Sequence, residues 1–471
     1  MKKTFLIIAL LLNSFAIFAQ EIYEKPVVDE RVELMNIVFR LAEISGYVNN
    51  NIPMYVDEAD RYFEKYKNHP LIEYTKILQN TLQNVNGYGF SLGVGVRFAI
   101  LLELKNGKIA FNKNIKTDIA DSFNQDSIPK YLNLLNDFYK KTKFHNFFTK
   151  NEKIRQIAEK NFVKEITNKI NFDWFKSFFR FLPEKKFRII ISLAGGFHNF
   201  GQTLVYKDDS QEFYAIIGCR SADENGFPMF KGGLGDMSNT LIHEICHSFC
   251  DAPILAYQDE LLPQATVFFE LNKMKLYEIS YREPMAFLHE IFVRTCVFQY
   301  KKDNNIKYEL ANYLEEVEVF LWLPQLLEAF GKYRNDTTYK TLNDFMPEIV
   351  KLQNSLNPQK IYDEMPTITG TSIENGSENV DYNIDHITVY FDRQMLVGYE
   401  FPTPYVIIAQ PSAVEFTKEK WNNEGTEWTF YVKLEPDTQY SIKIPYWNFI
   451  ESQQRYFAKN DCILTFKTRK K

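Results

Sequence analysis

Two histidines and a glutamate stand at the spacing that metal-dependent hydrolysis requires. The pattern H-E-x-x-H occurs at His243, Glu244 and His247. On a helix, residues four apart share a face, so both imidazoles could reach one ion. Glu244 is rotated by about 100° from His243, where it could take a proton from a metal-bound water instead of binding the metal. Because zinc lowers the pKa of such a water to roughly 7, this trio is suited to amide hydrolysis.

The residues around the motif predict a buried helix that carries it. Apolar side chains flank and interrupt the motif at Leu241, Ile242, Ile245 and Phe249. Asp236 or Ser238 could cap the start of this helix, and Pro253 is expected to end it. The alternative is a buried helix with two core histidines satisfied by hydrogen bonds. Two histidines and an acid are costly to bury without a shared partner, which favours the metal site.

A second buried helix offers a third ligand. The segment from Pro284 to Tyr300 opens with proline and is apolar nearly all round, which predicts a buried helix. Glu290 would project from it, and an unpaired carboxylate there is costly. Binding one zinc per chain would resolve that, since His-His-Glu with water in the open position is a catalytic zinc set. The alternative is an ion pair with Arg294 at i, i+4. Glu283 and His289 are weaker ligand candidates.

A group that stabilises the transition state is harder to choose. Tyr281, Arg294 and His198 are the candidates, and the sequence leaves the choice open. We expect Arg294 and Tyr281 to act beside Glu244 in catalysis. Arg294 could instead hold Glu290 in place or bind the oxyanion.

The cysteines do not form a disulfide framework, because there are five and they are sparse. Cys246 and Cys250 lie one helical turn apart. Cys250 shares the face of the two histidines, so it could close a structural zinc site as a fourth ligand. A small buried side chain is the simpler interpretation of this residue.

The start of the chain and its charge indicate a secretory protein. Lys2 and Lys3 precede an apolar run from Phe5 to Leu12, which predicts a signal peptide over 1–20 cleaved near Ala19 or Gln20. No cysteine stands directly after the leader and no later stretch could span a membrane, so we expect a secreted or periplasmic protein without a lipid anchor. We also expect it to be a monomer. The chain has 55 basic and 60 acidic side chains, a net charge of −5, which argues against a nucleic-acid surface.

The 471 residues are enough for two or three domains, and their periodicity predicts an α+β fold. Residues 21–185 are expected to be helical. Residues 186–356 would form the zincin-like catalytic part, with a small sheet before the motif helix. The strands of this sheet are expected at Phe187–Leu193, Phe200–Tyr206 and Glu212–Cys219. Tyr214–Cys219 is our candidate for the edge strand along which a peptide substrate would pair.

Glycine-rich segments interrupt these elements twice. Gly226 to Gly235 is expected to form a lip of the cleft. The glycines from Gly87 to Gly95 lack a preceding strand and have the wrong spacing for a phosphate loop, so they predict a turn that leads into a helix.

The last part of the chain changes to short β-rich segments. Residues 357–365 are expected to be a linker and 366–471 a β-sandwich. Leu434 to Tyr440 has the corner and tyrosine of immunoglobulin-like modules. No catalytic cluster occurs in this part.

Several segments carry a resemblance to a known family. They are Val32–Met35 with Phe39–Ala42, Tyr62–Phe63 with His69–Pro70, Thr240–Phe249 and Glu290–Arg294. Together they resemble a family of secreted proteins, common in Bacteroidetes, that carries an uncharacterised domain with a zinc-peptidase motif. The resemblance covers about 21–356 and implies a gluzincin-like site, with His243, His247 and Glu290 as ligands and Glu244 as base. The tail from Pro366 to Thr468 is similar to bacterial Ig-like domains of surface-layer proteins.

The leading functional hypothesis is a secreted zinc metallopeptidase acting on a peptide or protein substrate. The Ig-like module would tether the enzyme, space it from a surface, or bind a surface or glycan. A binding protein with a structural zinc is the alternative, and Cys250 within about 2.3 Å of the metal would favour it. A glycan-binding or glycan-cleaving role is a third option, for which no pair of acids is singled out by spacing.

Overall fold

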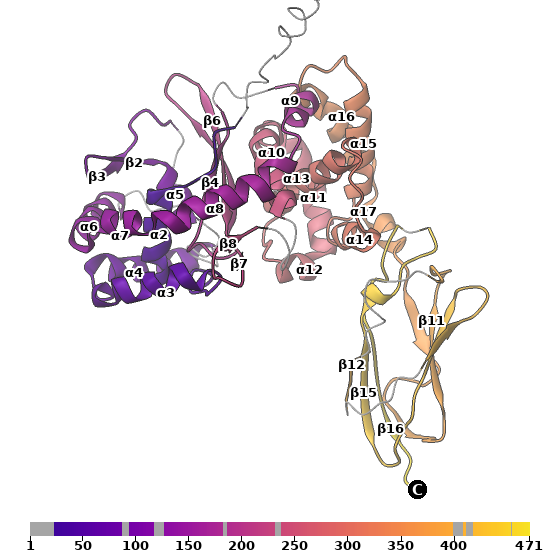
Figure 1. Ribbon diagram of the computed structural model, residues 1–471. Helices are drawn as coiled ribbons and strands as arrows, with labels where there is room; N and C mark the ends of the chain where they lie inside the picture. Colours follow the sequence, from indigo (N-terminus) through magenta and orange to yellow (C-terminus); the bar gives the residue numbers. More distant parts are fainter. Residues whose placement is uncertain are drawn as a thin grey trace, which may run out of the picture. The chain divides into compact units, whose positions relative to one another are not determined.

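The structure is a computed structural model that describes residues 23–86, 94–116, 127–181, 186–230, 237–398, 408–410, 418–453 and 455–471. The expected leader at 1–20, most of the glycine segment at 87–95 and half of the expected lip at 226–235 lie outside these residues. The chain divides into two compact units, Met1–Ala252 and Pro253–Lys471, and the boundary falls inside one long helix, α10. Helices and strands both occur, so the predicted α+β class is confirmed (Figure 1).

The first unit begins with a run of helices, as the periodicity predicts. They are α2 (Glu30–Leu41), α3 (Pro53–Phe63), α4 (Pro70–Asn86), α5 (Val94–Ile100), α6 (Ile128–Thr142), α7 (Phe144–Lys150), α8 (Glu152–Glu165) and α9 (Asp173–Phe179). Asp29 caps α2 by accepting a hydrogen bond from the Arg31 N–H at 2.8 Å. The purely helical expectation for 21–185 is wrong in two places, because the strand β1 (Val27–Val28) precedes α2. A hairpin of β2 (Leu102–Lys105) and β3 (Lys108–Phe111) interrupts the helices.

A four-stranded sheet follows, in the order β1-β4-β6-β5. Its strands are β1 (Val27–Val28), β4 (Arg188–Ser192), β6 (Gln211–Gly218) and β5 (Asn199–Val205). The first three are parallel, and β5 runs antiparallel to β6. The three predicted strands are confirmed, but the predicted edge is wrong. Tyr214–Cys219 belongs largely to the inner strand β6, which is buried from Glu212 to Gly218, and the half-buried β5 beside it is an edge strand.

The motif helix α10 spans Met237–Ala256 and continues through Pro253. The prediction that Pro253 ends it is therefore wrong. A proline inside a helix removes one backbone hydrogen bond, but the next residue, Ile254, is completely buried, and that burial favours continuing the helix past the proline.

In the second unit, the expected helix Leu261–Tyr277 is divided into α11 (Gln258–Leu271) and α12 (Lys273–Glu278). The break falls at Asn272, whose buried side chain donates a hydrogen bond to the Val319 carbonyl at 3.1 Å. The expected helix at Pro284 is α13 (Pro284–Asp303). Four more follow: α14 (Leu310–Val319), α15 (Leu323–Asn335), α16 (Leu342–Ser355) and α17 (Pro358–Asp363), the last inside the expected linker.

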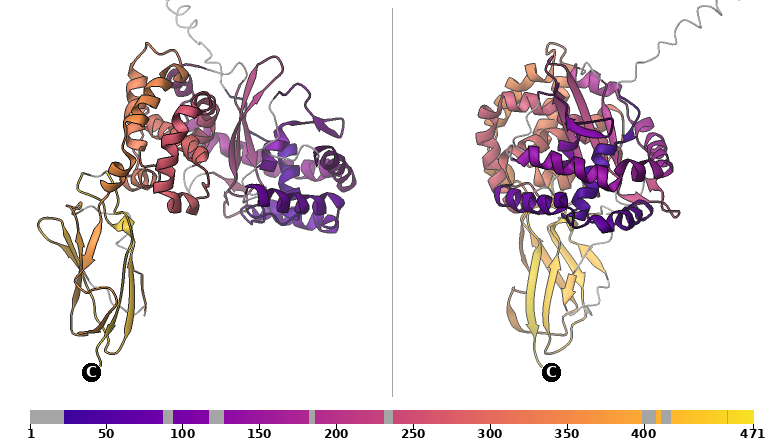
Figure 2. Two further views of the ribbon diagram at one scale, coloured as in Figure 1. Left: turned by 180° about the vertical axis from the view of Figure 1, so that it is seen from behind. Right: turned by 90° about the vertical axis from the view of Figure 1, so that its left-hand side faces the viewer.

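The end of the chain forms two four-stranded sheets around one core, drawn in orange to yellow in Figure 2. One sheet has the order β10-β16-β15-β12 and the other β13-β14-β11-β9. The strands are β9 (Ile368–Thr371), β10 (Ser377–Val380), β11 (His386–Phe391), β12 (Ile408–Gln410), β13 (Glu419–Trp421), β14 (Glu427–Tyr431), β15 (Gln439–Ile444) and β16 (Cys462–Thr468). Both sheets contribute to the core, with Trp428 and Phe430 from one and Tyr440 and Phe466 from the other.

Candidate metal centre

An aromatic cluster anchors the motif helix α10 in the first unit. Phe249 stacks on Phe179 with ring centroids 4.3 Å apart and also contacts Phe213 at 5.2 Å. Leu241, Ile245 and other apolar residues of the helix are fully buried, whereas His243 and His247 are only half-buried. The apolar face therefore fixes the helix, and the histidine face is left accessible.

The edge strand β5 lies directly on the motif helix. A Cβ atom at Gly201 would be 2.2 Å from the Glu244 carbonyl oxygen and 3.0 Å from the His247 Cβ. Any side chain would collide with the helix backbone, so glycine is required at this contact. The backbone of β5 is thereby held beside the residues of the H-E-x-x-H motif.

The two histidines of the motif point to the same side of α10. Their ring centroids are 5.0 Å apart and the rings are inclined by 79°. The Nδ1 of His247 lies 3.4 Å from an Asp251 carboxylate oxygen one turn later. Because a carboxylate accepts, this contact favours the tautomer in which Nδ1 donates its proton to Asp251 and Nε2 of His247 is the atom that could bind a metal.

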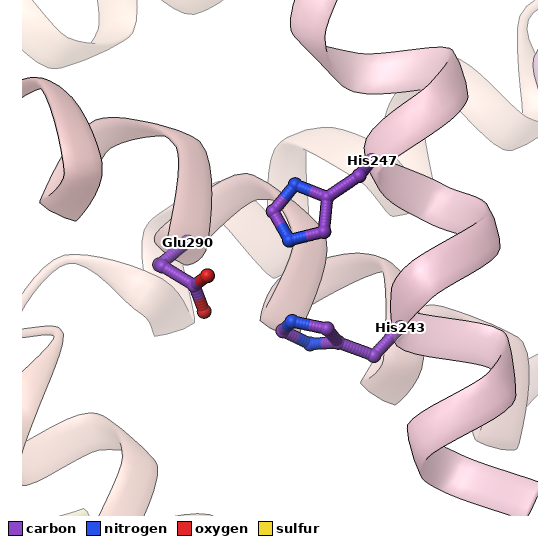
Figure 3. A group of neighbouring side chains, drawn as sticks. All are labelled: His243, His247 and Glu290. Carbon is purple, nitrogen blue, oxygen red and sulfur yellow. The ribbon is translucent and has the colours of Figure 1, made fainter. Parts of the chain in front are cut away.

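Glu290 of α13 faces these histidines, as Figure 3 shows. One ligand atom from each of His243, His247 and Glu290 lies within 4.8 Å of the other two. In the part of the chain that the structure describes, no other group of three His, Cys, Asp or Glu residues converges in this way. Cys250, Glu283 and His289 are described residues and do not belong to this group.

Glu290 is held by a polar network on its own helix and its neighbours. Arg294 donates from Nε to Glu290 at 3.2 Å, from Nη1 to Glu316 at 2.5 Å and from Nη2 to the Tyr281 hydroxyl at 3.0 Å. The ion pair between Glu290 and Arg294, which was the alternative to a metal-ligand role, is thus present alongside the metal-ligand geometry. Burial acts to lower the pKa of Arg294, but Glu316, Tyr281 and Glu290 outweigh it, so the net shift is upward and the guanidinium stays charged.

This network places two of the predicted catalytic residues around the third ligand. Burial raises the pKa of Tyr281, so its hydroxyl stays protonated. Arg294 and Tyr281 both contact Glu290, directly or through each other. Their positions suit a role in orienting Glu290. Glu316 was not anticipated, because nothing near it in the sequence distinguishes it from other acids of α14.

Glu244 is buried, with 7% of its surface exposed. The negative charge of Glu244 acts on two arginines that sequence reasoning missed, Arg97 of α5 and Arg220, which follows β6. His198 packs its ring against Tyr47, with centroids 4.6 Å apart, and burial lowers its pKa to about 4, so the imidazole is neutral at neutral pH. Cys246 and Cys250 are buried and are not joined in a disulfide.

Comparison with known proteins gives one strong match and several weak ones. Among solved structures, "Structure of surface layer protein SbsC, domains 1-6" is 9% identical over 49% of this chain and 33% of that one, with a TM-score of 0.19. "Crystal structure of the N-terminal part of the bacterial S-layer protein SbsC" is 10% identical over 46% and 57%, with a TM-score of 0.18. The chain therefore spans between a third and three-fifths of the length of those chains. TM-scores this low do not show a shared fold.

Curated proteins gave no match to the sequence. Among the residues that the structure describes, no helix has the length and apolar character needed to cross a membrane. The model of the "Domain of unknown function (DUF4932)" matches residues 26–352, well over half of the sequence and including all three residues of the metal cluster. By that match, the chain belongs to the DUF4932 family.

Proposed function

We propose that this chain is a secreted, gluzincin-like zinc peptidase with His243, His247 and Glu290 as metal ligands. One observation carries the proposal: Glu290, from a different helix, lies within 4.8 Å of both imidazoles of the motif. A histidine pair alone could be a feature of the core. A carboxylate that converges on the pair from another buried helix is the arrangement that a catalytic zinc needs.

The donor set fits zinc in type and in spacing. Two imidazole nitrogens and one carboxylate are ligands that zinc accepts, each at about 2.0–2.2 Å. Ligands at that distance in a tetrahedron lie about 3.4 Å apart, so a small side-chain adjustment from 4.8 Å would close the set. Asp251, by accepting the proton of His247 Nδ1, would fix the tautomer that presents Nε2 to the metal.

The protein groups have distinct roles in the proposed reaction. When bound, zinc would supply a Lewis acid that polarises a carbonyl and acidifies a water. Glu244 would accept the proton of the attacking water and pass it to the leaving amine. Arg294 and Tyr281 would hold Glu290 in its ligating position.

The edge strand β5 suits a peptide substrate. It pairs with β6 on one side, and its C-terminal end is met by residues 114–116. From Asn199 to Thr203, no other described strand pairs with it. A peptide could add itself to this edge by backbone hydrogen bonds and so lie beside Glu244. The antiparallel edge next to the motif helix supports a zincin-like fold.

Cys250 bears on the alternative of a binding protein with a structural zinc. A structural site needs four protein ligands. Among the described residues, Cys250 does not join the cluster of His243, His247 and Glu290, which favours a three-ligand site with one open position.

The C-terminal sheets keep a recognition or tethering role in the proposal. The Tyr440 hydroxyl accepts a hydrogen bond from the Glu435 N–H at 2.7 Å, as in the tyrosine corner of Ig-like modules.

Metal analysis combined with peptide hydrolysis tests the proposal. The purified chain should contain one zinc, Glu290→Ala should lose or weaken it, and Glu244→Gln should keep zinc but hydrolyse no peptide. Glu283→Ala is the matched control, because this exposed glutamate directly precedes α13 and its side chain makes no capping hydrogen bond. Zinc retention that does not depend on Glu290, or full hydrolysis by Glu244→Gln, would reject the proposal.

A further inference from the structure

Four buried polar atoms without a hydrogen-bond partner gather around the start of β5. They are Arg97 Nε, Arg220 Nε, Tyr47 Oη and His198 Nε2. Aromatic contacts link two of these side chains to each other and to β5. Tyr47 packs on His198 at 4.6 Å, and His198 stacks on Phe200 at 6.0 Å.

The two arginines cover aromatic rings on the same segment. The Arg97 guanidinium lies 5.9 Å from the centre of the Phe200 ring, and that of Arg220 lies 6.0 Å from the Phe197 ring. Within the described parts of the chain, neither arginine makes a hydrogen bond or an ion pair. Arginine does not release its proton, so two cations stand here with their donors unused.

Buried N–H donors that make no hydrogen bond lower the stability of a protein unless a ligand accepts hydrogen bonds from them. Buried polar groups in native proteins are almost always paired, and exceptions call for a reason such as a binding role. Both arginines are half-buried, so the guanidinium groups are not sealed from an incoming group. Their planar forks match the two oxygens of a carboxylate.

The site is preorganised by close backbone packing. A Cβ at Gly218, two residues before Arg220, would be 2.4 Å from the Gly196 carbonyl oxygen and 2.7 Å from that of His198. The turn that starts β5 therefore sits directly on the end of β6. This contact fixes Arg220 relative to Phe197 and His198 before any ligand arrives.

The arginines also lie in the electrostatic field of the proposed base. Burial lowers the pKa of Arg97 and of Arg220, and the charge of Glu244 works against that shift in both. An anion bound between these arginines would thus be near Glu244, on the side of the metal cluster where β5 begins.

We propose that Arg97 and Arg220 form a subsite for a carboxylate of the substrate. This inference rests on the proposed peptidase function and names its substrate class. Tyr47 and His198 complete the subsite as neutral groups, with the Tyr47 hydroxyl as a further donor. A peptide lying along β5 brings to this position either its C-terminal carboxylate or an acidic side chain.

Peptide binding tests the subsite separately from hydrolysis. The full chain carrying Glu244→Gln would be titrated with acetyl-trialanine, with its C-terminal amide, and with acetyl-Ala-Asp-Ala amide. The free acid should bind about tenfold more tightly than the amide, because charge-assisted hydrogen bonds are lost in the amide. Tight binding of the aspartyl peptide would assign the subsite to an acidic side chain, and weak binding of it would assign the subsite to the chain terminus.

The same titrations with arginine variants identify the subsite. Arg97→Gln and Arg220→Gln should each abolish the preference for the acid, and Arg97→Lys should keep part of it. Arg61→Gln, on the exposed face of α3, is the matched control. Thermal melts should show that removing either unpaired arginine leaves the ligand-free protein as stable or more stable. Equal binding of acid and amide, or an acid preference unchanged in both Gln variants, would overturn the subsite.

These experiments distinguish failure of the carboxylate subsite from failure of the proposed peptidase function. Arginine-dependent carboxylate binding by a wild-type chain that cleaves none of the peptides would support the subsite and reject the peptidase. Cleavage of acid and amide peptides at equal rates by the wild-type chain would reject the subsite and leave the peptidase standing.

Discussion

Arg294 lies one helical turn after Glu290 on α13 and donates a hydrogen bond to its carboxylate at 3.2 Å. The same guanidinium binds Glu316 and Tyr281, so one side chain joins three partners. Only a planar fork with several donors can serve all three at once. The orientation of the third candidate ligand therefore depends on a residue that does not need to contact the metal.

Replacing Arg294 with lysine should weaken zinc binding about tenfold, because loss of a residue that orients a ligand typically costs 10- to 100-fold. A lysine ammonium is a single point charge and cannot hold Glu290, Glu316 and Tyr281 together. The measurement is a competition titration with a chromophoric chelator. Arg334→Lys, which changes the pair of Arg334 with Asp303 at 3.1 Å, is the matched control. Unchanged zinc affinity in a folded Arg294→Lys protein would show that the network does not orient Glu290.

Local spacing predicted the parts of the site that depend on one helix. His243 and His247 share a face because they are four residues apart, and Glu290 was singled out because it interrupts a buried helix. The structure brings these three together. Arg97, Arg220 and Glu316 had no such signal. Each is a single charged residue whose neighbours lie far away in the sequence, and only the tertiary fold determines which partners it meets.

Two predictions about the fold are wrong for physical reasons. The apolar run Tyr214–Cys219 was expected to be an edge, yet a strand that is apolar at successive positions is suited to burial on both faces. The half-polar segment from Asn199 to Val205 was the better edge candidate. Pro253 was expected to stop α10, but burial of the next residue, Ile254, favoured continuation.

Gly201→Ala should destabilise the protein by about 1–3 kcal/mol, because its Cβ would be 2.2 Å from the Glu244 carbonyl oxygen. The new Cβ cannot move away from this oxygen without moving β5. The oxygen belongs to the backbone of α10 and cannot move without moving that helix. Gly370→Ala is the control, since no atom lies within 4 Å of its Cβ position and its φ is unstrained. Urea unfolding of both variants measures the difference. Equal stabilities would contradict the close contact of β5 with the motif helix.

Glu33 of α2 should make stability fall as pH rises from about 4.5 to 7. Burial raises the pKa of Glu33 to about 7, although the N–H groups of Leu193 and Ala194 donate to it and act to lower it. Between the unfolded and folded pKa values, the folded state holds a proton that the unfolded state has released. The unfolded state then binds fewer protons, so the free energy of unfolding decreases with pH.

Glu33→Gln should remove that pH dependence, which amounts to about 3 kcal/mol for a shift of this size. Urea unfolding at pH 4.5, 6 and 7.5 gives the comparison, taken as the difference between wild type and variant so that other groups cancel. His198, with its pKa lowered to about 4 by burial, acts in the opposite direction, and its contribution cancels in this difference because it is present in both proteins. The same pH slope in both proteins would mean that Glu33 is ionised when folded.

Asp251→Asn should reduce zinc affinity about tenfold and leave the fold intact. Asp251 accepts the Nδ1 proton of His247 at 3.4 Å and is itself nearly half exposed, so its loss should cost little stability. An asparagine amide could turn its NH₂ toward Nδ1, which would favour the tautomer with the proton on Nε2 and block that lone pair. Asp259→Asn, on the exposed face of α11, is the control. If Asp251→Asn binds zinc as tightly as wild type, His247 does not use Nε2 as the ligand atom, and the site would have to be built from the Nδ1 side of the ring.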